Sequence, residues 1–136
     1  MKHKVGFSVS VKFLSILIQK IEMLGSTICV IGCHLAAHAP YLQDRINNIT
    51  DIWQKISFKN NTLNIPYHDI IVWCGDMNFR VEKPFETAMS LIEKKQFTNL
   101  AMFDQLNTNK AYCFPGFNEH ELNYNPTFKF HPNSDA

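Results

Sequence analysis

Apolar and polar residues alternate in the N-terminal part of the chain, with an apolar side chain at every second position from Phe7 to Phe13. An alternation of period two is typical of a half-buried β-strand, so we predict a strand over residues 7–18. A second apolar run predicts a strand over residues 27–32, which makes residues 19–26 the connection of a hairpin. No apolar run approaches the ~18 residues that a transmembrane helix requires.

The spacing of apolar residues changes to every three or four positions after Pro40, and proline is favoured in the first turn of a helix. Another apolar run ends in Gly75 and Asp76 and has the length of a strand. Strands mixed with helices in this way favour a layer of an α/β sandwich over a helix bundle. We predict helices over residues 40–58, 85–95 and 99–106, a loop over 59–66, a buried strand over 69–74, and irregular chain after residue 106.

Composition narrows the possible functions. The 136 residues suffice for one domain or part of one, and 46% of them are apolar, which is ample for a packed core. A formal net charge of +1 and a pI of about 7.7 do not indicate a protein that coats nucleic acid, so any anion site must be local. The four cysteines form no Cys-x-x-Cys pair, and we predict reduced thiols in a cytosolic protein.

The strand over residues 69–74 leads directly into Gly-Asp-Met-Asn. Gly75 permits a tight turn or a close approach to a ligand. Asp76 and Asn78 lie on the same side if the chain stays extended. A carboxylate beside an amide suits the hydrolysis of a phosphate ester, because the carboxylate takes a proton and the amide donates a hydrogen bond to an anionic oxygen. An Asx turn at the strand end explains the same residues equally well.

The strand over residues 27–32 likewise leads into polar groups, at His34 and His38. A single histidine at a strand end is more often a hydrogen-bonded structural residue than a catalytic one. A His-x-x-x-His pair on a helix is able to bind zinc, but Pro40 follows closely and no third ligand is evident, so zinc is not favoured.

Three motifs occur in order along the chain: His-Leu-Ala-Ala-His at residues 34–38, Trp-Cys-Gly-Asp-Met-Asn-Phe-Arg at 73–80, and Pro-Thr-Phe-Lys-Phe at 126–130. Together they resemble the inositol polyphosphate 5-phosphatases, type II enzymes above all, of the endonuclease/exonuclease/phosphatase superfamily. The resemblance extends over residues 27–135. It implies that residues 1–136 are a partial catalytic domain, an α/β fold that is part of a four-layer sandwich and incomplete at both ends. The family has a shorter turn near residues 14–24, which suggests an insertion there.

The resemblance also implies roles for individual residues. His34 would contact the scissile phosphate, Asp76 would orient and deprotonate the attacking water, and Asn78 would hold that water or a phosphate oxygen. The implied substrate-binding residues are His38, Arg80 and Lys129. An ordinary surface salt bridge explains Arg80 equally well. Lys129 would contact a 4-phosphate, although the family has Tyr where this chain has Phe128 and Phe130.

The activity implied is Mg²⁺-dependent hydrolysis of the 5-phosphate of a phosphoinositide lipid or a soluble inositol polyphosphate. The enzyme would be cytoplasmic and peripheral at membranes, with no nucleic acid as partner. The family's metal ligands and its terminal His-Asp pair match nothing in this chain, so we expect no metal ligand here and little activity of these residues alone.

Alternative functions remain open. One is a non-catalytic fragment that binds phosphoinositides or a protein. Another is a nuclease of the same superfamily, which the Pro-Thr-Phe-Lys-Phe motif and the lack of basic excess argue against. Glu119 and Glu121 are spaced like a metal-binding or glycosidase pair, but no sugar-binding set of aromatic residues accompanies them, and a solvated turn is favoured.

Overall fold

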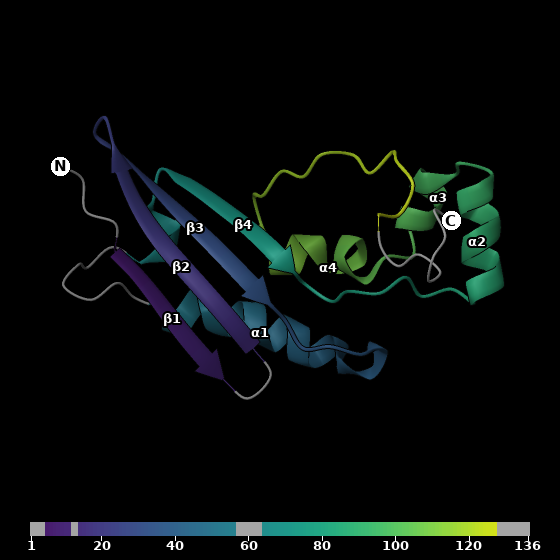
Figure 1. Ribbon diagram of the computed structural model, residues 1–136, viewed down its shortest axis with the longest axis horizontal. Coiled ribbons are helices and arrows are strands. Elements are labelled where there is room, and N and C mark those ends of the chain that lie inside the picture. The colour runs from purple at the N-terminus through teal and green to yellow at the C-terminus, as the bar shows by residue number, and fades with distance from the viewer. Residues whose placement is uncertain (1–4, 12–13, 57–63, 128–136) are drawn as a thin grey trace, which may run out of the picture. The chain divides into compact units, whose positions relative to one another are not determined.

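A computed structural model describes residues 5–11, 14–56 and 64–127, and within these ranges it describes side chains from residue 15 onward. The chain divides into two compact units, Met1–Phe79 and Arg80–Ala136. The first unit holds a mixed sheet and the second is mainly helical (Figure 1). This confirms the predicted α/β class.

The sheet of the first unit has four strands in the order β1-β2-β3-β4. Neighbours pair antiparallel except β3 and β4, which run parallel. A parallel pair needs a crossover, and here the connection contains the helix α1. The strands are β1 (Val5–Val11), β2 (Leu14–Met23), β3 (Ser26–His34) and β4 (Ile70–Asp76).

The prediction of one strand over residues 7–18 is wrong, because two strands occupy this segment. The apolar positions change from odd numbers up to Phe13 to even numbers from Leu14, and a single strand cannot keep both sets on one face. The predicted connection 19–26 is also wrong, since β2 continues to Met23. Leu24 and Gly25 then reverse the chain with φ of 52° and 85°, the signs required at both positions of a type I′ hairpin turn. Residues 14–23, where an insertion is predicted, thus form a central strand of the sheet.

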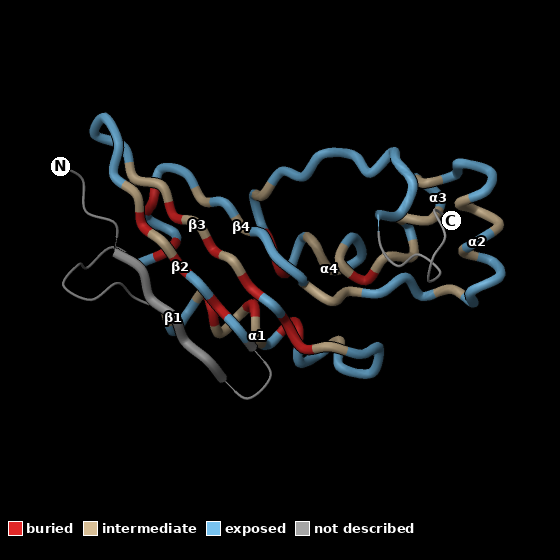
Figure 2. Tube along the Cα trace, viewed as in Figure 1, coloured by how far each residue is buried: buried red, intermediate tan, exposed pale blue. Residues whose placement is uncertain are grey.

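The core of the first unit lies between one face of the sheet and α1 (Leu42–Lys55) (Figure 1). Buried positions alternate along β2 and β3 (Figure 2), as expected of strands that are covered on one face. The predicted helix over 40–58 is largely confirmed, since a 3₁₀ turn at Ala39–Tyr41 precedes α1; residues 57 and 58 lie outside the described residues. The buried apolar residues of sheet and helix are Ile16, Ile18, Cys29, Ile31, Cys33, Ile46, Ile49 and Ile52.

The opposite face of the sheet is open in the described residues. Ile70 and Val72 of β4 are 50% and 44% exposed, and Leu17 of β2 is 50% exposed. The predicted strand over residues 69–74 is therefore confirmed in its position, but the prediction that it is buried is wrong. Burial alternates along β4, because only the side that faces α1 is covered.

The second unit contains α2 (Phe85–Glu93), α3 (Phe97–Ala101) and α4 (Gln105–Cys113). The predicted helix over residues 85–95 is confirmed. The predicted helix over 99–106 is wrong, because the chain is interrupted between α3 and α4, where Asp104 caps the N-terminus of α4 by accepting the N–H groups of Leu106 and Asn107. None of the described helices has the length and apolar character needed to cross a membrane.

Candidate functional site

The carboxyl ends of β3 and β4 form the edge at which the sequence places its polar residues. His34 ends β3, Asp76 ends β4, and the parallel register pairs them directly. His34 Nε2 lies 3.6 Å from Asp76 Oδ2, and the two side chains are 60% and 63% exposed. Ligands of α/β sheets bind outside the carboxyl ends of parallel strands, so this accessible pair is the candidate functional site.

Gly75 allows the two strands to end side by side. Its φ is +121°, and a Cβ here would lie 2.0 Å from the carbonyl oxygen of Cys33. Only glycine combines this conformation with room for the neighbouring backbone. The close approach predicted for Gly75 is thus an approach to β3, and it places Asp76 beside His34.

Asn78 does not continue the strand, so the expectation that it lies on the same side as Asp76 in an extended chain is wrong. The strand ends at Asp76, and Asn78 has a φ of 55°. Its backbone N–H donates to Asp76 Oδ1 at 3.1 Å, which is the Asx turn considered as the alternative. Its side-chain Nδ2 donates to the carbonyl oxygen of Leu35 at 3.0 Å. Asn78 therefore orients the Asp76 carboxylate and ties the two strand-end loops together.

His38 lies four residues after His34, in an exposed loop rather than on a helix. The helical His-x-x-x-His geometry for zinc is thus not formed. In the described part of the chain, no group of three or more His, Cys, Asp or Glu residues is placed to hold a metal ion. The ring of His38 lies 6.3 Å from that of Tyr41 in an edge-to-face arrangement.

Arg80 and Lys129 belong to the second unit. Arg80 does not lie on a strand, because β4 ends at Asp76. Its backbone is held instead by Gln105, which accepts the Arg80 N–H at its side chain (3.1 Å) and donates its own N–H to the Arg80 carbonyl (2.9 Å). Lys129 lies outside the described residues.

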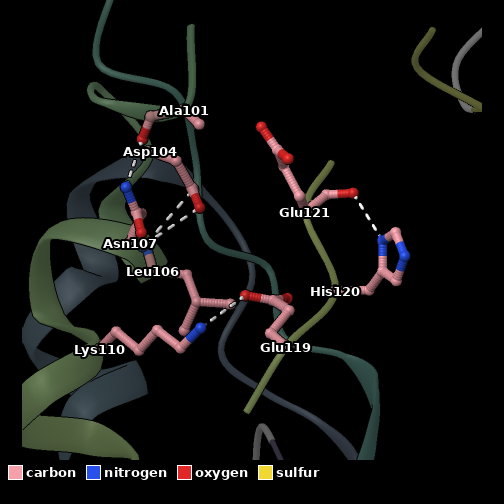
Figure 3. Close-up of polar contacts among 8 residues, drawn as sticks. All are labelled: Ala101, Asp104, Leu106, Asn107, Lys110, Glu119, His120 and Glu121. Carbon is pink, nitrogen blue, oxygen red and sulfur yellow. Dashed lines mark hydrogen bonds and ion pairs between the residues drawn. The ribbon is translucent and has the colours of Figure 1, made fainter. Parts of the chain in front are cut away.

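The carboxylates of Glu119 and Glu121 point in different directions (Figure 3). Glu119 forms an ion pair with Lys110 at 3.4 Å, and Glu121 accepts from the Thr98 hydroxyl at 3.5 Å. This agrees with the solvated turn favoured above. Burial raises the pKa of the nearby Asp104 carboxyl, and the charge of Glu119 adds to this rise, while the two N–H groups that Asp104 caps oppose it.

Three of the four cysteines are poorly placed to act as nucleophiles. All are free, and three are buried. Burial raises the pKa of Cys29 to about 11 and also raises that of Cys33 and Cys113. The thiolate is the reactive form, so these buried thiols pack as small apolar groups.

Sequence reasoning missed two residues of α1 that hold the loop after β3. Arg45 donates to backbone carbonyls of this loop, and Asn48 Oδ1 accepts the Ala36 N–H at 3.3 Å. The available signal was the position of Arg45, four and seven residues before the buried Ile49 and Ile52 and hence on the covered face of the helix.

Comparison with known proteins assigns the chain to a family. The model of endonuclease/exonuclease/phosphatase family 2 matches residues 2–136. The type II inositol 1,4,5-trisphosphate 5-phosphatase of Mus musculus is 34% identical over 124 residues, which are 85% of this chain and 12% of that protein. The chain thus spans about an eighth of the length of this curated relative.

Two solved structures share the fold. The inositol polyphosphate 5-phosphatase domain of SPsynaptojanin, in complex with inositol (1,4)-bisphosphate and calcium ion, has a TM-score of 0.89 and 26% identity, and the match covers 98% of this chain and 41% of that one. A ferrous NO complex of a Cimex nitrophorin has a TM-score of 0.75 at 22% identity, covering 99% of this chain and 48% of that one; this second match shows the fold alone. The family match, the strand-end site and the resemblance to 5-phosphatases agree: the chain belongs to the endonuclease/exonuclease/phosphatase family 2.

Proposed function

We propose that residues 1–136 are part of a catalytic domain that hydrolyses the 5-phosphate of an inositol polyphosphate or a phosphoinositide. The observation that carries this proposal is the exposed pair of His34 and Asp76, set side by side by the register of β3 and β4. The 5-phosphatases among the similar proteins support this choice of reaction. The nitrophorin match shows why the fold alone does not.

The two oxygens of Asp76 have separate tasks in this proposal. Oδ1 accepts the Asn78 N–H, which fixes the plane of the carboxylate, while Oδ2 faces His34. Oδ2 orients the attacking water and takes its proton. His34 contacts the scissile phosphate and stabilises the charge that develops on its oxygens; in enzymes generally, stabilisation of this kind is usually the largest single contribution to the rate. Water attacks the phosphorus in line as the bond to the inositol 5-oxygen breaks on the opposite side, the leaving oxygen takes up a proton from solvent, and no covalent intermediate forms on the enzyme.

Asn78 donates to the Leu35 carbonyl, and we assign it the further task of holding the water or a phosphate oxygen. His38, Arg80 and Lys129 bind the phosphates that do not react, and Lys129 contacts the 4-phosphate. A guanidinium suits a pair of phosphate oxygens because its donors form a planar fork.

Magnesium is the ion we assign to the complete domain. The described residues do not fit a metal site of their own, since no three of their His, Cys, Asp or Glu side chains gather to hold one. The ligands therefore come from outside this set, and the tasks given to His34 and Asp76 involve no bond to the ion. A lipid substrate further implies a cytoplasmic protein that contacts membranes peripherally.

A chimera tests the proposed function. Residues 1–136 replace the matching segment of the SPsynaptojanin domain, which has the same fold, and phosphate release is measured with Mg²⁺. We expect release from inositol 1,4,5-trisphosphate and none from inositol 1,4-bisphosphate, which lacks the 5-phosphate. The isolated chain should stay far below the ~10 per second typical of enzymes. A cooperatively folded chimera that releases no phosphate, or releases it equally from both compounds, contradicts the proposal.

A further inference from the structure

Arg45 is fully buried, with 0% of its surface exposed. Burial of a charge is costly unless hydrogen bonds replace its water. Nη1 donates to the carbonyl oxygens of Ala36 (3.1 Å) and His38 (2.7 Å), and Nη2 donates to that of Ala39 (3.4 Å). One guanidinium on α1 thus holds most of the loop that leads from β3 to the helix.

The backbone of His38 is the strained part of this loop. Its φ is 72° and its ψ is 148°, close to a region that almost only glycine occupies. Such a conformation persists only where the surroundings enforce it. The shortest of the Arg45 hydrogen bonds, 2.7 Å, is the one to the His38 carbonyl. The guanidinium is therefore placed to hold this histidine in its unusual conformation.

Arg45 also contacts the loop that follows β4. The centroid of the Phe79 ring lies 5.5 Å from its Cζ atom, within range of a cation–π interaction. Phe79 follows Asn78, whose side chain donates to the Leu35 carbonyl. Both loops of the candidate site thus converge on one buried charge.

From these contacts we infer that Arg45 is a positioning residue for the phosphate site. It does not touch substrate. It holds His38 in the conformation that presents the imidazole to a substrate phosphate and keeps the loop after β3 in place against Asn78 and Phe79. The contact of His38 with a substrate phosphate rests on the proposed function. Whether Arg45 holds the loop in place can be tested without measuring activity.

The first arm of the test is hydrogen exchange on the full 136-residue chain. Arg45→Lys keeps the charge but loses the planar fork that reaches three carbonyls, whereas Ile52→Ala lowers stability from the same helix without touching the loop. We expect exchange in residues 35–41 and 77–79 to rise at least about tenfold in Arg45→Lys relative to the amides of β2 and β3. In Ile52→Ala the increase should be spread over the unit. The same spread pattern in both variants overturns the inference.

The second arm measures kinetics in the SPsynaptojanin chimera. Arg45→Lys should raise KM about tenfold with a smaller loss of kcat, because it misplaces a residue that binds a non-reacting phosphate. The effect should be largely absent when His38→Ala is already present, since the two changes act on one group. Full additivity with His38→Ala, or a loss no larger than that of Ile52→Ala, overturns the inference. A folded but inactive wild-type chimera counts against the proposed function alone, and the exchange data still decide the role of Arg45.

Discussion

Gly75 lies at the point where the backbones of β3 and β4 approach most closely. A methyl group there would meet the Cys33 carbonyl oxygen at 2.0 Å, and φ is +121°. We predict that Gly75→Ala lowers the free energy of unfolding by about 2–4 kcal/mol, because it combines backbone strain with overpacking. Urea denaturation followed by circular dichroism measures this loss.

Gly25 provides the matched control for this substitution. It also has a positive φ, of 85°, but a Cβ there would have no atom within 4 Å. Gly25→Ala should therefore cost only about 1 kcal/mol, the conformational part alone. Equal losses at the two positions would show that the close strand contact at Gly75 adds nothing to the cost of a side chain there.

Lys129 belongs to the binding of the substrate in our proposal rather than to the reaction. In the chimera, Lys129→Ala should raise KM with little change in kcat, because the residue touches a phosphate that does not react. The effect should be larger for substrates with a 4-phosphate than for those without one. Steady-state kinetics with one substrate of each kind measure the difference; an equal fall in kcat for both, with KM unchanged, would refute the assignment.

At the scale of elements, a hydrogen-bond cluster joins the amino ends of β3 and β4. Asp69 Oδ2 accepts from the Thr27 N–H (2.7 Å) and from its hydroxyl (2.9 Å), and the Thr27 Oγ1 accepts the Asp69 N–H (3.2 Å). The bonds from Thr27 lower the pKa of the Asp69 carboxyl. The cluster therefore fixes the register at the end of the pair opposite to His34 and Asp76.

This shift predicts a pH dependence of stability. A carboxyl whose pKa is lowered on folding stabilises the protein above its unfolded pKa of ~3.9, and this contribution is lost as the pH falls through the folded pKa. We expect the difference in urea midpoint between wild type and Asp69→Asn to be largest near neutral pH and to shrink on acidification below ~4. A difference that stays constant down to acidic pH would contradict the role of the Asp69 carboxylate.

Sequence patterns predicted those elements whose signal is local. The strands that end at His34 and Asp76 and the helix after Pro40 follow from runs and periods within the chain. The place of β2 in the sheet does not follow from a local pattern, because it depends on pairing with β1 and β3. The polar sequence of α4 has no amphipathic period, and its one clear local signal is the N-terminal cap at Asp104.

The candidate site was predictable in its residues but not in its geometry. Motifs selected His34 and Asp76, and the parallel register brings them together. The left-handed turn at Asn78 was not predicted, because a residue other than glycine with positive φ is held by its surroundings rather than by its own preference. The burial of Arg45 depends on the path of the loop just before its helix, and the sequence pattern does not predict that path.

At the scale of the whole molecule, the open face of the sheet has a consequence in solution. Exposed apolar surface on an edge strand promotes association, and Ile70 and Val72 of β4 lie on that face. We predict that the isolated chain associates as its concentration rises and that Val72→Thr weakens this association. Sedimentation velocity over a concentration series measures it.

The control for this substitution is Val81→Thr, the same change at an exposed position of the second unit, where Val81 is 39% exposed. It should leave the association unchanged. The prediction is contradicted if the wild-type chain sediments as a monomer at every concentration. It is also contradicted if the two substitutions change the association equally, because the open face would then not be its site.

We attribute the phosphoryl chemistry to the paired ends of β3 and β4, and this is our central claim. Its most direct test is kcat in the chimera for Asp76→Ala and His34→Ala, with Lys129→Ala measured alongside. Both site variants should lower kcat ~10²–10³-fold, because each removes a contact to the transferred group or its attacking water, while their thermal transitions stay close to that of the unsubstituted chimera. Turnover within a factor of about two of the unsubstituted chimera for Asp76→Ala or His34→Ala would contradict the claim.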